Sequence, residues 1–206
     1  MLKVCGVWKQ FKISGKLITA LNNINLSLPK GKVLCLMGPN GSGKTTLIKI
    51  IATLIIPDKG DAFVDGYSVV KEPSKVKKLI GYISRDERSL YWRWTARYNL
   101  KFYAYMYNVP RSEIDFRINE LLDFVGLSEW ADVEVMRFST GMKQKLIICR
   151  GLLHDPPLLL MDEPTSGLDL SSAIKVRKLI KRLCREKNKT ILLATHNPEE
   201  AAELGD

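Results

Sequence analysis

Runs of apolar residues alternate along the chain with polar, glycine-rich turns, at spacings that switch between those of strands and of helices. A continuous apolar run over residues 33–37 stops at a glycine-rich loop, and Leu47, Ile51 and Leu54 then recur at helical spacing. The same kind of run predicts buried strands over 79–84, 157–161 and 190–195. Buried strands that alternate with helices predict an α/β fold with a mostly parallel sheet.

The first part of the chain has a different pattern. Residues 3–28 alternate apolar and polar positions around a turn near Gly15 and Lys16, which predicts an antiparallel pair of strands and an N-terminal antiparallel β subdomain. Asp61 to Val64, followed by Asp65 and Gly66, predicts a short hairpin strand and its turn.

Helical spacing dominates the middle of the chain. Residues 112–125 carry apolar side chains on one face, with Ser112 as the expected cap and Gly126 as the expected end. Residues 138–153 continue from a small-residue turn as a second helix with Ser139 as N-cap candidate, and a helix N-terminus can receive an anion. We therefore expect a helical subdomain, at about 88–155, inserted into an α/β core within a single domain of residues 1–206.

Aromatic residues are concentrated in one segment. Residues 91–107 contain eight of the seventeen Phe, Trp and Tyr residues of the chain. Such a cluster forms either a protein interface or a small local core, and the pattern leaves both interpretations open.

Composition narrows the class of protein. The 206 residues are 46% apolar and 26% charged, as in ordinary globular proteins, and no apolar stretch reaches the length of a membrane span. The N-terminus lacks a signal-peptide pattern, so we expect a cytoplasmic protein. Four scattered cysteines without C-x-x-C spacing argue against zinc, disulfides and redox catalysis, and we expect them in the core.

The net charge of +10 is compatible with nucleic acid, an anionic membrane surface or plain solubility. The lysines are spread along predicted helices, which favours solvated faces and makes nucleic-acid binding the weaker interpretation.

The glycine-rich loop carries the first chemical signal. Residues 38–45 match G-x-x-x-x-G-K-[ST] between a predicted strand and helix, a pattern whose backbone N–H groups cradle phosphates. Lys44 would supply a cation for the β- and γ-phosphates, and the Thr45 hydroxyl would ligate Mg²⁺.

Two later strands end in polar residues suited to the same reaction. The strand at 157–161 leads into Asp162 and Glu163, of which the first can hold Mg²⁺ and the second can polarise an attacking water. His196 follows the strand at 190–195, at the sheet edge where open α/β folds bind ligands, which favours contact with the γ-phosphate. Trp8 and Phe11 could each stack on a purine, although an aromatic in a strand is more often a core residue.

The order of these motifs resembles the nucleotide-binding domain of ATP-binding cassette (ABC) transporters over nearly the whole chain, with its P-loop NTPase core. Residues 38–45 resemble the family's Walker A motif, 138–142 its signature, 158–163 Walker B, 166–169 the D-loop, and His196 the switch histidine. The resemblance implies ATP and Mg²⁺ as cofactors, with Glu163, His196 and Lys44 catalytic and Thr45 and Asp162 at the metal. It implies ATP contacts from Phe11 rather than Trp8, and from Gly38, Pro39, Asn40, Gly41, Ser42, Gly43, Lys44, Thr45, Thr46, Ser139, Gly141 and Asp169.

The sequence departs from the family pattern in three places. Arg85, Asp86 and Glu87 stand where the family usually has a glutamine, and Asp86 and Glu87 are both candidates to approach the metal. The signature has Thr140 in place of a glycine and Met142 in place of a glutamine. The chain ends at Asp206, and by the resemblance we expect further C-terminal strands to be missing.

The resemblance implies an ATPase subunit that powers a membrane transporter. It would act as a homodimer or heterodimer, with two ATP molecules between Walker A of one subunit and the signature of the other. A membrane subunit would dock near residues 85–107, on the cytoplasmic face of the cell membrane. Residues 87–93 resemble the loop of some drug-export ATPases, which favours export. The alternatives are a soluble ABC ATPase that acts on ribosomes or DNA, which usually has two cassettes or a coiled-coil insertion, and a non-hydrolysing partner in a heterodimer.

Overall fold

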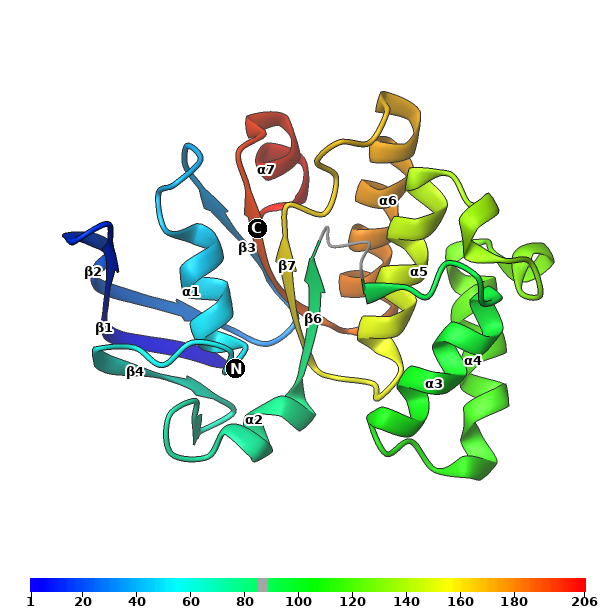
Figure 1. The fold of residues 1–206 in the computed structure, drawn as a ribbon, viewed down its shortest axis with the longest axis horizontal. Helices are drawn as coiled ribbons and strands as arrows, with labels where there is room; N and C mark the ends of the chain where they lie inside the picture. The colour runs from blue at the N-terminus through cyan, green and yellow to red at the C-terminus, as the bar shows by residue number, and fades with distance from the viewer. Residues whose placement is uncertain (85–88) are drawn as a thin grey trace. The chain divides into compact units, whose positions relative to one another are not determined.

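The computed structural model describes residues 1–84 and 89–206, which form two compact units (Figure 1). The first unit comprises residues 1–82, 157–163 and 181–206, and the second comprises 83–156 and 164–180. The elements, in chain order, are β1 (Leu2–Ile13), β2 (Lys16–Leu28), β3 (Val33–Met37), α1 (Lys44–Ile51), β4 (Lys59–Val64), β5 (Tyr67–Ser68), α2 (Pro73–Leu79), β6 (Ile80–Ser84), α3 (Ala96–Met106), α4 (Arg111–Val125), the 3-10 helices η2 (Ser128–Trp130) and η3 (Val135–Arg137), α5 (Thr140–Leu152), β7 (Leu158–Asp162), α6 (Leu170–Lys187), β8 (Thr190–Thr195) and α7 (Pro198–Leu204). The predicted substitutes for the family glutamine, Arg85, Asp86 and Glu87, lie outside the described residues.

Two four-stranded sheets organise the first unit. One has the order β2-β1-β4-β5 and is antiparallel, which confirms the predicted N-terminal pair, and its hairpin closes with Ile13 opposite Lys16. The other has the order β3-β8-β7-β6, and β3, β8 and β7 are parallel, as the continuous apolar runs predict. The carboxyl ends of β3, β7 and β8 therefore meet at one edge of the sheet.

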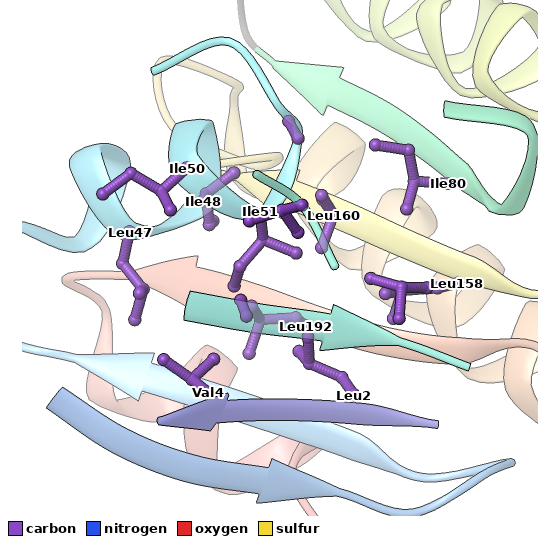
Figure 2. Close-up of a cluster of buried hydrophobic side chains, with 14 of the residues drawn as sticks. Leu2, Val4, Leu47, Ile48, Ile50, Ile51, Ile80, Leu158, Leu160 and Leu192 are labelled. Atoms are coloured by element: carbon purple, nitrogen blue, oxygen red, sulfur yellow. The ribbon is translucent and has the colours of Figure 1, made fainter. Parts of the chain in front are cut away.

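The core of the first unit lies around α1. Its Leu47, Ile48, Ile50 and Ile51 are buried and meet side chains from both sheets, among them Leu160 of β7, Leu192 of β8 and Val4 of β1 (Figure 2). The helix is buried on several sides, so the loop before it is held at both ends by packed elements. This packing fixes the position of the phosphate loop relative to β7 and β8.

Helices α3, α4 and α5 form the main body of the second unit. Figure 1 shows α3 and α4 side by side in green, and their buried side chains include Leu100 of α3 and Ile114 and Ile118 of α4. α5 contributes a long buried face that includes Leu146, Ile147 and Ile148. The second unit thus has its own apolar core.

Three local expectations need correction. α4 begins at Arg111 after Pro110, and the Ser112 hydroxyl is not its cap, because proline fixes the backbone turn ahead of the helix and no side chain caps it. α1 ends at Ile51, so Leu54 lies beyond the helix and is exposed. Of the four cysteines only Cys149 is buried, while Cys5, Cys35 and Cys184 are half-buried. Gly126 ends α4 in the left-handed conformation, as predicted.

Within the described residues, no helix combines the length and the apolar character needed to cross a membrane.

Candidate functional site

The phosphate loop joins β3 to α1 at the edge of the parallel sheet. α1 starts at Lys44 with Gly43 as its N-cap, and no side chain accepts a hydrogen bond from its first turn. The N–H groups of a first helical turn carry a partial positive charge and have no partner within the helix. This end of α1 is therefore suited to an anion.

Only glycine fits at position 43. Its φ of +94° lies in the left-handed region, and a Cβ there would lie 2.3 Å from the carbonyl oxygen of Ala20 on β2. β2 thus approaches the loop so closely that a side chain would displace one or the other. Gly43 is therefore required by the close approach of Ala20, in addition to the phosphate binding that the motif predicts.

Lys44 lies across the mouth of the loop. Its Nζ donates hydrogen bonds to the carbonyl oxygens of Gly38 at 2.6 Å and Pro39 at 3.1 Å. The same atom is 3.8 Å from Glu163 Oε1, and the lysine side chain is only 9% exposed. A buried ammonium group held this way is a cation directed at the site rather than a solvated surface charge.

Thr45 and Asp162 meet, as the metal hypothesis requires. The Thr45 hydroxyl donates to Asp162 Oδ1 at 3.0 Å, across 117 positions of the sequence. Burial raises the pKa of the Asp162 carboxyl, and the nearby Glu163 charge raises it further. The Thr45 hydrogen bond and the positive charges of Lys49 and Lys44 act in the opposite direction. A divalent cation next to this carboxylate would oppose the effect of burial.

Glu163 and His196 face each other from the ends of β7 and β8. His196 Nδ1 lies 2.7 Å from Glu163 Oε2, and a carboxylate oxygen only accepts, so the hydrogen of this bond belongs to Nδ1. Glu163 Oε1 is buried and has no hydrogen-bond partner. One oxygen of the carboxylate is therefore fixed by the histidine, while the other lies near Lys44 Nζ and accepts no hydrogen bond.

A pocket of about 200 Å³ in the first unit brings most of the predicted ATP contacts together. Its lining residues are Phe11, Ala20, Asn40, Gly41, Ser42, Gly43, Lys44, Thr45, Thr46 and Glu163. Phe11 is among them and Trp8 is not, and the Trp8 ring instead packs near Lys59 Nζ, at 5.9 Å. Sequence reasoning missed Ala20 as a pocket residue, although the glycine at 43 signals that another backbone comes close there.

The predicted contacts Ser139, Gly141 and Asp169 belong to the second unit. Ser139 caps α5, as predicted, by accepting a hydrogen bond from the Met142 N–H at 3.3 Å. Asp169 Oδ1 accepts one from the Ser172 N–H at 2.9 Å, and its bonds to Ser172 lower the pKa of this exposed carboxyl. The roles of these three residues in ATP binding stay predictions.

The aromatic segment 91–107 shows features of both interpretations left open by the sequence. Tyr91 stacks on Trp94 with ring centroids 4.2 Å apart, and Phe102 meets both rings edge-on. Trp92 and Tyr98 remain 48% and 57% exposed. The cluster is thus packed within itself and also presents aromatic surface.

The residues of the first unit fit a nucleoside triphosphate with Mg²⁺. Gly41 of the loop faces open space, since a Cβ there would meet nothing within 4 Å, and α1 has an uncapped N-terminus. The Thr45 and Asp162 oxygens are the hard ligands that Mg²⁺ prefers. Glu163 Oε1, which is buried near Lys44 Nζ and accepts no hydrogen bond, adds an acceptor beside them.

Comparison with known proteins gives consistent matches. The family described as ABC transporter matches residues 21–166. The chain is 40% identical over its whole length to the ABC transporter ATP-binding protein NatA of Bacillus subtilis, of which it covers 83%. It is also 40% identical over 91% of its length to the linearmycin resistance ATP-binding protein LnrL of the same species, of which it covers 60%. Relatives named for taurine and methionine import match at 34% and 35% identity.

A solved structure has the same fold. The ATP-binding cassette MJ0796, in a dimeric post-hydrolysis state bound to ADP and Pi, superimposes with a TM-score of 0.87 at 30% identity. The match covers 98% of this chain and 91% of the other.

Proposed function

This chain belongs to the ABC transporter family, as an ATP-binding subunit with ATPase activity, and on that premise we propose that it powers an exporter. The resistance function in the name of LnrL and the resemblance of residues 87–93 to drug-export loops support export. Import-named relatives match less closely, so the direction is the part of the proposal that an experiment must decide. We also propose a peripheral location on the cytoplasmic face of the membrane.

One observation carries the proposed ATP-driven function. Five side chains gather around the phosphate loop, namely Lys44, Thr45, Asp162, Glu163 and His196. Asp162 ends β7, Glu163 and His196 directly follow β7 and β8, and Lys44 and Thr45 open α1, so packed elements hold all five. An electrostatic site that is already ordered needs little reorganisation when charge develops on a phosphate.

In the proposed hydrolysis each side chain has a separate task. Lys44 would turn from the loop carbonyls to the β- and γ-phosphates, and the N–H groups of the loop would hold the same oxygens. Glu163 Oε1 would accept the proton of the attacking water while Oε2 stays bonded to His196. Thr45 and Asp162 would hold Mg²⁺, which when bound would neutralise negative charge on the phosphates.

We propose that the active form is a dimer in which Ser139, Gly141 and Asp169 of one copy meet the ATP held by the other. The solved cassette MJ0796 is described as a dimer bound to ADP and Pi, which supports a dimeric form. The partner copy could be identical or a related subunit. A membrane subunit would dock near residues 85–107, and the exposed Trp92 and Tyr98 supply aromatic surface of the kind that anchors interfaces.

Replacement of Glu163 by glutamine tests the catalytic assignment. Because an amide cannot accept the proton, we expect Glu163→Gln to bind ATP as the wild type does and to lose about 100-fold or more in kcat, as general-base losses do. Glu129→Gln is the matched control, since Glu129 is an exposed carboxylate of the second unit and should keep wild-type turnover. Unchanged turnover of Glu163→Gln would remove Glu163 from the reaction.

The same variant tests the transport assignment. Tagged Glu163→Gln would be captured with ATP from detergent-solubilised membranes, and we expect a polytopic membrane protein to copurify. Ribosomal or chromosomal material would instead support the soluble alternative. Everted vesicles that contain the wild-type chain together with the membrane protein so identified should accumulate the transported compound when ATP is added outside, and ATP-driven release would contradict export.

A further inference from the structure

The first turn of α5 and the first turn of α6 are in direct contact at one point of the second unit. A Cβ added to Gly141 would lie 2.7 Å from Ser172 Oγ and 2.9 Å from Ser172 Cβ, closer than real Cβ contacts come. The half-buried Ser172 side chain therefore occupies the space beside Gly141, and a larger side chain at either position would push the two helix ends apart.

Ser172 is also bonded to Asp169. Its N–H donates to Asp169 Oδ1 at 2.9 Å, and a hydrogen bond from its side chain is the largest cause of the lowered pKa of that carboxyl. Ser172 thus lies against Gly141 of the predicted signature and is bonded to Asp169, the last residue of the predicted D-loop.

The capping of α6 by Asp169 does not by itself require a serine at position 172. An aspartate that caps a helix needs only the backbone N–H of the residue three positions on, which every residue except proline supplies. The hydroxyl and the small size of Ser172 are extra features, and both are used by the contacts to Asp169 and Gly141. The neighbour Ser171 is exposed and makes no such contact with Gly141.

We propose that Ser172 is a positioning residue that holds Asp169 and Gly141 in one fixed arrangement, so that a copy presents both together to the ATP bound by its partner. This inference rests on the proposed dimer. Ser172 itself need not touch ATP. Its effect is on the geometry of the surface that completes the partner's site, whereas the phosphate loop of the same copy lies in the first unit.

Two substitutions and a matched control test the proposal. Ser172→Val adds bulk toward Gly141, and Ser172→Ala removes only the hydroxyl. The matched control is Ser171→Val, which introduces the same valine at the exposed neighbouring position. Each would be made in the full chain and again with Glu163→Gln. The measurements are ATP affinity at subunit concentrations where the chain is monomeric, kcat and KM for ATP, ATP-dependent dimerisation of the Glu163→Gln form by light scattering, and Tm.

Because misplacement by about 1 Å can cost roughly 100-fold in rate, we expect Ser172→Val to lower kcat by about tenfold or more. We expect Ser172→Ala to lower kcat by about threefold to tenfold, with Tm close to the wild type, since the loss of one hydrogen bond of a half-buried hydroxyl takes away only a small part of the stability. ATP affinity of the monomer should stay within about twofold in both, dimerisation should weaken in parallel with kcat, and Ser171→Val should resemble the wild type.

Wild-type kcat and dimerisation in either Ser172 variant would overturn the inference, as would an equal defect in Ser171→Val or a loss confined to monomer ATP affinity. If Ser172→Val does not fold, Ser172→Ala decides the outcome. If the Glu163→Gln chain with its native Ser172 fails to dimerise with ATP, the proposed dimer is overturned, and this inference with it.

Discussion

At the scale of single residues, the adjacent carboxylates Asp162 and Glu163 at the end of β7 have different surroundings, which suit one to a metal ion and the other to accepting a proton. Asp162 ends β7 and is buried against Thr45. Glu163 has a φ of +53°, a left-handed conformation that non-glycine residues adopt at a cost of roughly 1–3 kcal/mol. Its N–H donates to the Ala194 carbonyl at 2.9 Å, which holds this conformation and turns the side chain toward His196. The strain therefore coincides with the proposed general base.

Crowding at Gly43 leads to a prediction about ATP binding. A Cβ at Gly43 would meet the Ala20 oxygen at 2.3 Å, whereas one at Gly15 would meet nothing within 4 Å, and both glycines have positive φ. We expect Gly43→Ala to abolish ATP binding measured by equilibrium dialysis, because the loop must move. Gly15→Ala should lose only the strain energy of about 1 kcal/mol, seen as a slightly lower Tm, and should bind ATP. Equal ATP affinity in the two variants would contradict this explanation.

The chemistry of these residues could be predicted from sequence where it is local. The phosphate loop is a contiguous pattern, so Lys44 and Thr45 were identifiable from spacing alone. The choice of Phe11 over Trp8 came from the family resemblance, because both are aromatics in the same strand. The contact of Glu163 with His196 depends on the pairing of β7 with β8, which residue spacing does not specify.

At the scale of elements, the start of α3 depends on one buried polar side chain. Asn99 is fully buried, accepts a hydrogen bond from the Tyr91 N–H at 2.8 Å, and donates to the carbonyls of Tyr91 at 2.9 Å and Thr95 at 3.0 Å. These bonds tie the loop that precedes α3, with its exposed aromatics, to the helix. The hydrophobic pattern gave no sign of this, since a polar residue in an apolar stretch predicts exposure.

We therefore expect Asn99→Ala to destabilise the protein. Three lost bonds of about 1 kcal/mol each amount to roughly 3 kcal/mol. At about 2–4 °C per kcal/mol for a chain of this size, Tm should fall by about 6–12 °C, with a change in tryptophan fluorescence from Trp92 and Trp94. Asn119→Ala is the control, because Asn119 is exposed and its Oδ1 accepts a hydrogen bond from the surface side chain of Arg97 at 2.7 Å. A wild-type Tm for Asn99→Ala would show that the loop is held by other contacts.

Boundaries of elements were less predictable than their existence. The helix over 112–125 and its end at Gly126 follow from periodicity and from the left-handed preference of glycine. The start of α4 does not follow from the sequence, because Pro110 and Ser112 are both acceptable near a helix N-terminus. Only the backbone conformation shows at which residue the helix begins.

At the scale of the whole molecule, the predicted ATP contacts are divided between the two compact units. Lys44, Glu163 and His196 belong to the first unit, while Ser139 and Gly141 belong to the second. The sequence places Ser139 and Gly141 in the helical subdomain expected at about 88–155, but it gives no sign that residues 164–180 belong to the same unit, since β7 interrupts that unit along the chain. The proposed dimer uses it, because each copy would contribute its first unit to one ATP and its second unit to the other.

This division predicts that two inactive variants restore activity when mixed. Lys44→Ala removes the phosphate contact of the first unit, and Ser139→Phe blocks the helix end of the second, so each should be inactive alone. In a mixed dimer the intact phosphate loop of one chain meets the intact α5 terminus of the other. Random pairing makes half of the dimers mixed with one of two sites intact, so an equimolar mixture should recover about a quarter of the wild-type ATPase rate. Pull-down through a tag on one variant would verify that mixed dimers form. Mixed dimers without recovered activity would contradict a site shared between two copies, and the expected recovery would exclude a site completed within a single chain.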